Sequence, residues 1–142
     1  MEAIDQALLD ARTIAVVGLD DRDWRTAYRI AEYLQGAGFR IVPVPFQQWA
    51  DETLGEKSYH RVQDIPGHVD IVDVFVRSEQ TDAVIDDAIA AGAGAVWLQS
   101  GITNDAGLER ARAAGLLATQ DRCAMVEHRR LLRETGQEKS WP

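Results

Sequence analysis

The stretch Thr13–Asp20 (TIAVVGLD) decides the fold of this 142-residue chain. Its β-branched apolar run has the length of a strand and ends at Gly18, and a helical pattern begins near Arg25 after a short polar turn. A strand–turn–helix unit directs free backbone N–H groups and a helix N-terminus to the space above the strand, and both favour an anion. Arg25 and Arg29 add positive charge to that helix. The unit therefore predicts a phosphate-bearing ligand at this turn.

Composition places the chain among ordinary globular proteins. It is 46% hydrophobic and 27% charged, which is too apolar for a disordered chain. Its formal charge of −8 disfavours nucleic acid and anionic membranes as partners, because both require a basic face. A single cysteine, Cys123, and the lack of a signal-like or membrane-length apolar run favour the cytoplasm. We expect one domain over residues 1–142, with a leading helix in residues 1–12 and a frayed tail in residues 134–142.

Apolar runs alternate with helical patterns along the whole chain. Strands are expected at residues 14–17, 39–44, 70–76, 93–98 and 116–119, with a short edge strand at 58–62. Helices are expected at residues 2–11, 25–37, 78–91 and 105–114, and again near the C-terminus, with Ser78 and either Thr103 or Asn104 as N-caps. Pro43 and Pro45 lack an N–H donor, so we expect them to mark the carboxyl end of the second strand.

This alternation predicts an α/β fold, a three-layer doubly wound parallel sheet of Rossmann-like type. Right-handed crossovers give the expected strand order 3-2-1-4-5-6, with residues 58–62 as strand three. In that order, the chain leaves strands 14–17 and 70–76 in opposite directions, so their carboxyl ends open a crevice. Residues 18–25 form one lip of the crevice, and residues 75–78 form the other.

The crevice lacks the signatures of two common nucleotide sites. The dinucleotide fingerprint needs three glycines in the turn and an acidic residue after the second strand. Here the turn holds Gly18 alone, and the second strand ends in residues 42–45 (VPVP), so NAD is disfavoured. The sequence contains no Gly-Lys-Ser or Gly-Lys-Thr, which excludes a Walker-type phosphate loop.

Several candidate residues also have a purely structural interpretation. Gly18 fits tight strand-to-helix packing, and Arg25 and Arg29 fit ion pairs at the surface. Tyr28 fits core packing equally well. Arg77 is the stronger polar candidate, because a guanidinium at the carboxyl end of a strand suits phosphate or carboxylate. The three histidines show no ligand spacing, so no metal site is predicted.

Six segments together resemble a known family. They are residues 15–19 (AVVGL), 25–29 (RTAYR), 41–44 (IVPV), 69–75 (VDIVDVF), 95–102 (AVWLQSGI) and 121–131, from DRC to EHRRL. In this order they resemble the stand-alone CoA-binding domain proteins, which are similar to the nucleotide-binding domain of the succinyl-CoA synthetase α subunit. The resemblance covers residues 10 to 132, and AVWLQSGI and the Asp-Arg-Cys segment are its most specific parts.

The resemblance implies that the cofactor is coenzyme A (CoA), lying across the carboxyl edge of the sheet. The phosphates of CoA would lie near Gly18, Leu19, Asp20, Arg25, Thr26, Tyr28 and Arg29. The adenosine end would lie near Pro43, Val44 and Pro45. Phe75, Val76 and Arg77 would form the opposite lip, and Gln99, Ser100 and Gly101 would contact the pantetheine arm.

Two positions depart from the family pattern. Asp20 stands where serine is usual, and a carboxylate there repels phosphate unless it is turned away or salt-bridged to Arg22 or Arg25. The family often has Pro-Val-Asn-Pro and then a basic residue after the second strand, whereas this chain has residues 43–48 (PVPFQQ). This segment offers no cation for the 3′-phosphate of CoA.

The functional prediction is a small CoA-binding protein that acts as a carrier, a sensor or the partner of a catalytic subunit, without catalytic residues of its own. The sequence shows no convincing nucleophile–base or carboxylate pair. One alternative is an enzyme that acts on a nucleotide or acyl-CoA through Cys123 or Arg77, although Cys123 fits a small buried side chain better. The other alternative is an interaction module that has lost its ligand. The expected partners are the small-molecule nucleotide and either a second copy of the chain or a catalytic protein.

Overall fold

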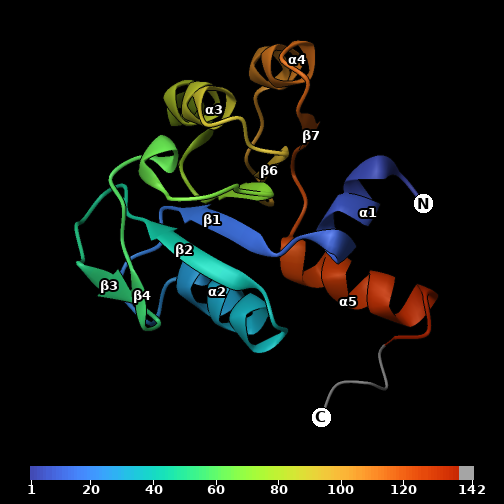
Figure 1. Ribbon diagram of the computed structural model, residues 1–142, viewed down its shortest axis with the longest axis horizontal. Helices are drawn as coiled ribbons and strands as arrows, with labels where there is room; N and C mark the ends of the chain where they lie inside the picture. Colours follow the sequence, from blue (N-terminus) through green and yellow to red (C-terminus); the bar gives the residue numbers. More distant parts are fainter. Residues whose placement is uncertain (138–142) are drawn as a thin grey trace.

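The computed structural model describes residues 1–137. Five parallel strands form one sheet in the order β2-β1-β5-β6-β7, with helices on both faces (Figure 1). The strands are β1 (Thr13–Val17), β2 (Arg40–Val44), β5 (Ile71–Val74), β6 (Ala95–Leu98) and β7 (Leu117–Thr119). Helices α1 (Ala3–Asp10), α2 (Thr26–Gly36) and α5 (Ala124–Glu134) cover one face, and α3 (Thr81–Ala90) and α4 (Asp105–Ala113) cover the other. The predicted Rossmann-like α/β fold is confirmed.

The sheet has a hydrophobic core on each side because its central strands are buried on both faces. Every residue of β1 and β5 is buried. Side chains alternate along β1, so that Ile14 and Val16 pack with α1, α2 and α5, while Ala15 and Val17 pack on the opposite side. Near-continuous apolar strands of this kind are typical of parallel sheets, which explains why the sequence predicts them well.

The predicted third strand at residues 58–62 is absent, and the sheet ends at β2. A hairpin of β3 (Glu52–Thr53) and β4 (Glu56–Lys57) lies beside β2 instead. Pro43 is the next-to-last residue of β2, opposite Val16, and Pro45 follows the last residue, so the two prolines mark the carboxyl end of the strand as predicted. The carbonyl of Pro43 faces outward and accepts the Tyr59 N–H at 3.0 Å. Because Pro43 and Pro45 have no N–H, this outer edge cannot support a further strand, and an edge strand is where proline is tolerated.

Gly18 occupies the point where β1 and β5 part. Its φ is +102°, and a Cβ at this position would lie 3.0 Å from the carbonyl oxygen of Phe75. An L side chain would therefore be strained and also crowded. Gly18 allows the two strand ends to approach each other, as its packing interpretation requires.

The starts of α3 and α4 differ in how well the sequence predicts them. Ser78 does not cap α3 but begins the short turn η2 (Ser78–Gln80), and its Oγ accepts the Thr103 N–H at 3.0 Å. Asn104 caps α4, as predicted, with its Oδ1 accepting the Gly107 N–H at 2.8 Å. A second short turn, η1 (Val62–Asp64), lies between β4 and β5.

The C-terminal region is described only in part. Glu134 still belongs to α5, and the N–H of Gln137 bonds to the carbonyl of Leu132 at 2.8 Å. The rest of the predicted tail, residues 138–142, lies outside the described residues. Within residues 1–137, no helix combines the length and the apolar character needed to span a membrane.

Candidate functional site

Two cavities open next to each other at the carboxyl edge of the sheet, where the sequence predicts a crevice. The first, which we call the arginine cavity, has a volume of about 390 Å³ and is lined by Gly18, Arg25, Phe46, Gln47, Phe75, Val76 and Arg77. The second, the cysteine cavity, has a volume of about 320 Å³ and is lined by Arg25, Thr26, Ala27, Ile30, Phe75, Gln99, Ser100, Ile102 and Cys123. The two cavities adjoin, because Arg25 and Phe75 line both.

The arginine cavity holds guanidinium groups from opposite lips. Arg25 is the N-cap residue of α2, and Arg77 lies after β5, just before η2. Arg25 donates to Oε1 of Gln47 at 3.1 Å, and neither arginine makes an ion pair with another of the residues 1–137. Both charges therefore remain available to an anionic ligand.

The N-terminus of α2 adds backbone donors. The N–H groups of Thr26, Ala27 and Tyr28 have no hydrogen-bond partner within the described part of the chain. Thr26 and Ala27 line the cysteine cavity, so this helix end adjoins it. Unpaired N–H groups and the helix dipole together favour an anion at such a position.

The glycine turn itself supplies fewer donors than the sequence suggests. The N–H of Gly18 bonds to the carbonyl of Val44 at 2.8 Å, and the N–H of Leu19 to that of Val16 at 3.4 Å. Leu19 is fully buried in the core. The accessible donors therefore belong to the helix, and Gly18 contributes a small surface in place of a hydrogen bond.

Asp20 is turned into the protein and paired. Only 3% of it is exposed, and Arg22 donates to its carboxylate from Nη2 at 2.5 Å and from Nε at 2.8 Å. Burial opposes ionisation of Asp20, but the hydrogen bonds and charge of Arg22 outweigh it and lower the pKa of the carboxyl. Asp20 lines neither cavity, so its charge does not confront a ligand there.

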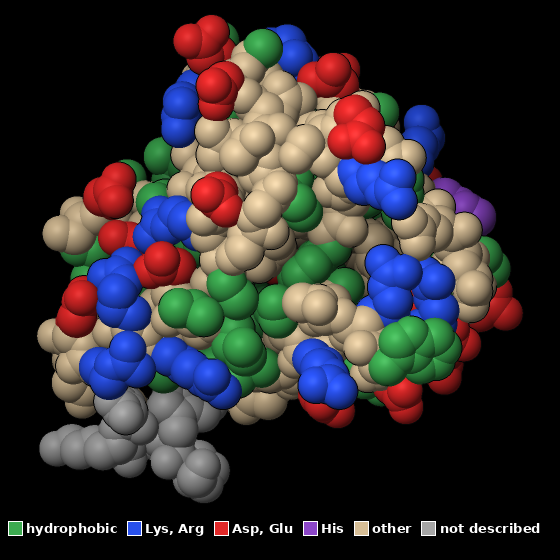
Figure 2. Space-filling view, turned by 180° about the vertical axis from the view of Figure 1, so that it is seen from behind, with side chains coloured by type: hydrophobic (Ala, Val, Ile, Leu, Met, Phe, Trp, Pro, Cys, Tyr) green, Lys and Arg blue, Asp and Glu red, His purple; other side chains and the backbone are tan. Residues whose placement is uncertain are grey.

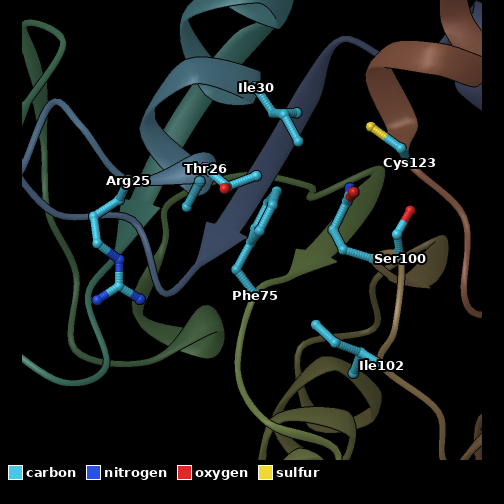
Figure 3. Close-up of a pocket in the computed structure, with 9 residues that line it drawn as sticks. Arg25, Thr26, Ile30, Phe75, Ser100, Ile102 and Cys123 are labelled. Carbon is cyan, nitrogen blue, oxygen red and sulfur yellow. The ribbon is translucent and has the colours of Figure 1, made fainter.

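The cysteine cavity has a charged residue at one end and a thiol at the other. Figure 3 shows Arg25 and Cys123 at opposite sides of it, with Phe75 between them and the sulfur of Cys123 turned toward Ile30. Apolar side chains from α2, β5 and the loop after β6 form much of the lining. Its shape and lining suit the apolar part of an elongated ligand whose anionic part lies at Arg25.

A buried acid lies beneath the cysteine cavity. Asp73 is fully buried within β5, and its Oδ1 accepts the Gln99 side-chain amide at 2.5 Å. Its other carboxylate oxygen has no partner among residues 1–137. Burial raises the pKa of Asp73 to about 7, although the bond from Gln99 acts against this. The signal in the sequence that could have identified Asp73 is its position, since it is the one acidic residue inside the apolar run 71–76.

The segment before α5 is fixed to the loop after β6. Oδ1 of Asp121 accepts the Gly101 N–H at 2.7 Å, and the indole of Trp97 donates to the carbonyl of Arg122 at 2.8 Å. The guanidinium carbon of Arg122 lies 5.2 Å from the centroid of the Trp97 ring. Trp97 is fully buried and belongs to the core of the sheet. These contacts hold Cys123 at the cavity wall.

The cavities contain only part of the predicted ligand-binding set. Gly18, Arg25, Thr26, Phe75, Val76, Arg77, Gln99 and Ser100 line them, whereas Leu19, Asp20, Tyr28, Arg29, Pro43, Val44, Pro45 and Gly101 do not. The lining residues absent from that set are Ala27, Ile30, Phe46, Gln47, Ile102 and Cys123. Helical spacing is a signal that could have identified Ile30, which lies four residues after the predicted Thr26 on the same face of α2.

The surface charge is uneven in spite of the net charge of −8. In the lower half of the face in Figure 2, Lys and Arg side chains flank a group of hydrophobic side chains. Trp24, Phe46 and Val126 are among the large hydrophobic residues exposed at the surface, at 67%, 41% and 55%. Local positive charge therefore coexists with the acidic surplus, as a small anionic ligand requires.

Comparison with known proteins gives one family and several relatives. Residues 12–129 match the model of a family described as a CoA binding domain. The protein YneT of Bacillus subtilis (strain 168) is 36% identical over 125 residues, which cover 88% of this chain and 91% of YneT.

Solved structures share the fold. A protein from Thermus thermophilus superposes with a TM-score of 0.84 and 35% identity, covering 90% of this chain and 96% of that one. The dinucleotide forming acetyl-coenzyme A synthetase 1 of Ca. Korarchaeum cryptofilum, in complex with phosphate and ADP, gives a TM-score of 0.71 and 26% identity, covering 82% of this chain and 27% of the synthetase. The same fold thus recurs in a chain of similar length and within a much longer enzyme.

Proposed function

Because this chain belongs to the CoA binding domain family, we propose that it binds CoA across the arginine and cysteine cavities. The observation that carries the proposal is the adjacency of the two cavities, which share Arg25 and Phe75. CoA has a matching division, with phosphates at its nucleotide end and a long pantetheine arm that ends in a thiol.

The phosphates are proposed to lie between Arg25 and Arg77. A guanidinium binds phosphate through two parallel N–H donors, and neither group is occupied by an ion pair within residues 1–137. The free N–H groups at the start of α2 add neutral donors on the same side. The pairing of Asp20 with Arg22 removes the repulsion that the sequence alone suggests.

The pantetheine arm is proposed to pass Phe75 and enter the cysteine cavity. Ile30, Ile102 and Phe75 provide apolar contacts for its methylene groups. Its amide groups need polar partners, which Gln99 and Ser100 offer. The Gln99 side chain is oriented by its bond to Asp73, so its recognition geometry exists before the ligand arrives.

The role that follows is binding without catalysis, as a carrier, a sensor or the partner of a catalytic subunit. Within the described residues, the lining of the two cavities includes no carboxylate and no imidazole. General acid–base chemistry on a bound thioester therefore has no evident side chain in the cavities.

Thermal unfolding with CoA, dephospho-CoA, NAD and ATP tests the proposal. At a concentration 100 times the Kd, CoA is expected to add about 2.7 kcal/mol to the free energy of unfolding. Stabilisation by NAD or ATP in preference to CoA, or by none of the four, contradicts the proposal. Equal stabilisation by CoA and dephospho-CoA indicates that the 3′-phosphate is not recognised, as the cation-free segment 43–48 predicts.

A further inference from the structure

The cysteine cavity ends at a thiol for which the proposed binding role has no use. Cys123 is partly exposed, forms no disulfide and lines the cavity together with Gln99 and Ser100. Its sulfur is turned inward, toward Ile30 on the opposite wall (Figure 3). It is also the single cysteine of the sequence.

A second feature of the same cavity points to a polar ligand. Asp73 lies in β5 and Phe75 directly follows its last residue, two positions along the same extended chain, so both face the side on which Ile71 packs, and Phe75 lines the cavity. The carboxylate of Asp73 accepts a hydrogen bond from Gln99, which lines the cavity. One of its oxygens is fully buried and lacks a partner within residues 1–137. A buried polar atom in that state is uncommon in folded proteins.

The hydrogen bond between Asp73 and Gln99 also determines which atom of the Gln99 amide is available to a ligand in the cavity. Nε2 of Gln99 donates to Oδ1 of Asp73, whereas Oε1 of Gln99 accepts no hydrogen bond from another side chain or backbone group of residues 1–137. The cavity thus offers an amide oxygen as an acceptor, next to a thiol. The complementary ligand is a chain that carries an amide N–H and ends in sulfur.

We propose that Cys123 forms a mixed disulfide with the thiol end of the ligand, so that the cavity can hold CoA in a covalent and reducible form. This inference rests on the proposed function, because CoA supplies both the amide and the sulfur. It adds redox-controlled retention of the ligand to reversible binding.

The chemistry is a thiol–disulfide exchange with a CoA disulfide as the electron acceptor. The Cys123 thiol loses its proton to solvent, and the resulting thiolate attacks one sulfur of the disulfide. A bond forms between Sγ of Cys123 and that sulfur, and the original S–S bond breaks. The second CoA leaves as a thiolate and takes a proton from solvent. Cys123 is oxidised and the departing CoA is reduced, so no other oxidant is needed.

The adduct is expected to persist until an external thiol reduces it. The chain has no second cysteine that could attack the mixed disulfide from within. Asp121 is bonded to the loop after β6 and Arg122 to Trp97 within β6, so the segment before Cys123 is held in place and the sulfur stays at the cavity wall.

The test is intact-mass analysis of the full chain treated with CoA disulfide or, in parallel, with glutathione disulfide. We expect one CoA per chain, attached at Cys123 and released by dithiothreitol. Docking makes the step effectively intramolecular, so labelling by CoA disulfide should be faster by about 100-fold than labelling by glutathione disulfide. In urea, where the cavity is lost, the two rates should become similar.

Two controls separate this inference from the binding proposal. Arg77→Gln should slow labelling by CoA disulfide while leaving alkylation of Cys123 by iodoacetamide unchanged. Cys123→Ser should still bind reduced CoA but should take up no CoA from CoA disulfide. Equal rates with the two disulfides in the folded wild-type chain overturn the inference, and if reduced CoA still binds, the proposed function stands. A chain that does not bind reduced CoA contradicts the proposed function itself.

Discussion

The arginine cavity and the cysteine cavity lie at the same edge of the sheet, yet they differ in almost every physical property. The arginine cavity presents two guanidinium groups that make no ion pair within residues 1–137. The cysteine cavity is lined largely by apolar side chains and a thiol, and an acid with a pKa raised by burial lies beneath it. Only Arg25 and Phe75 belong to both.

The difference shows how one sheet edge can serve a ligand with two chemical halves. Strand ends and the N-terminus of α2 supply charge and donors, which depend on backbone geometry and a few arginines. The apolar half instead depends on packing between α2, β5 and the start of α5. Mutations should therefore affect the two halves separately, except at residues that form their shared wall.

The largest expected effect comes from the acid under the cysteine cavity. From about pH 4 to about pH 7, Asp73 keeps its proton in the folded chain but loses it in the unfolded chain, so stability falls as the pH rises. Asp73→Asn cannot ionise and should not show this loss. Between about pH 5 and about pH 8, the wild type should lose about 3 kcal/mol more than the variant in urea unfolding. Parallel pH profiles would mean that Asp73 titrates normally.

The next effect concerns Gly18, which sets the shared wall through its contact with Phe75. Gly18→Ala should cost about 2 kcal/mol more than Gly38→Ala. Gly38 is a matched control, because its φ is +103° and a Cβ there would have no neighbour within 4 Å. Urea unfolding of both variants measures the difference. If both variants lose the same free energy of unfolding, backbone strain alone, and not the close approach of β1 and β5, requires glycine at position 18.

Single substitutions of the two arginines test whether the arginine cavity binds the phosphates of CoA. Arg25→Gln and Arg77→Gln should each weaken CoA binding by about 1.5 kcal/mol, roughly tenfold in Kd. Arg40→Gln is the control, since Arg40 begins β2 at the opposite edge of the sheet. Isothermal titration calorimetry gives the three affinities. If Arg40→Gln weakens binding as much as the other two, the effect is one of net charge and not of the cavity.

The smallest effect tests a backbone donor. Thr26 is the first residue of α2, where proline is well tolerated, and Arg25 before it is already extended. Thr26→Pro should therefore preserve the fold while removing one N–H. We expect CoA affinity to fall by about 0.7 kcal/mol, roughly threefold, with the melting temperature retained. An unchanged affinity for CoA would show that the N-terminus of α2 does not bind the phosphates.

These residues also show what the sequence can and cannot predict. The apolar runs that become β1, β5 and β6 are recognisable because buried parallel strands have few polar residues. The prediction of a strand at residues 58–62 was wrong. The sequence already shows why, because Pro43 and Pro45 have no backbone N–H to donate to a further strand at the outer edge of β2.

The predicted residues that line the cavities lie at strand ends and at the start of α2. Arg77 and Gln99 follow strands whose carboxyl ends meet at one edge, so topology alone brings them together. Cys123 reaches the cavity through the packing of α5 on the sheet, which no local pattern reveals. For Asp20 the sequence left pairing with Arg22 or Arg25 open, and the structure pairs it with Arg22, because which partner is in reach depends on how the turn folds.

A crystal structure of the chain with CoA tests the central claim most directly. The account predicts the phosphates within hydrogen-bond distance of Arg25 and Arg77, with the pantetheine arm passing Phe75 toward Cys123. CoA bound at another surface, or an arm that leaves the cysteine cavity empty, would contradict it.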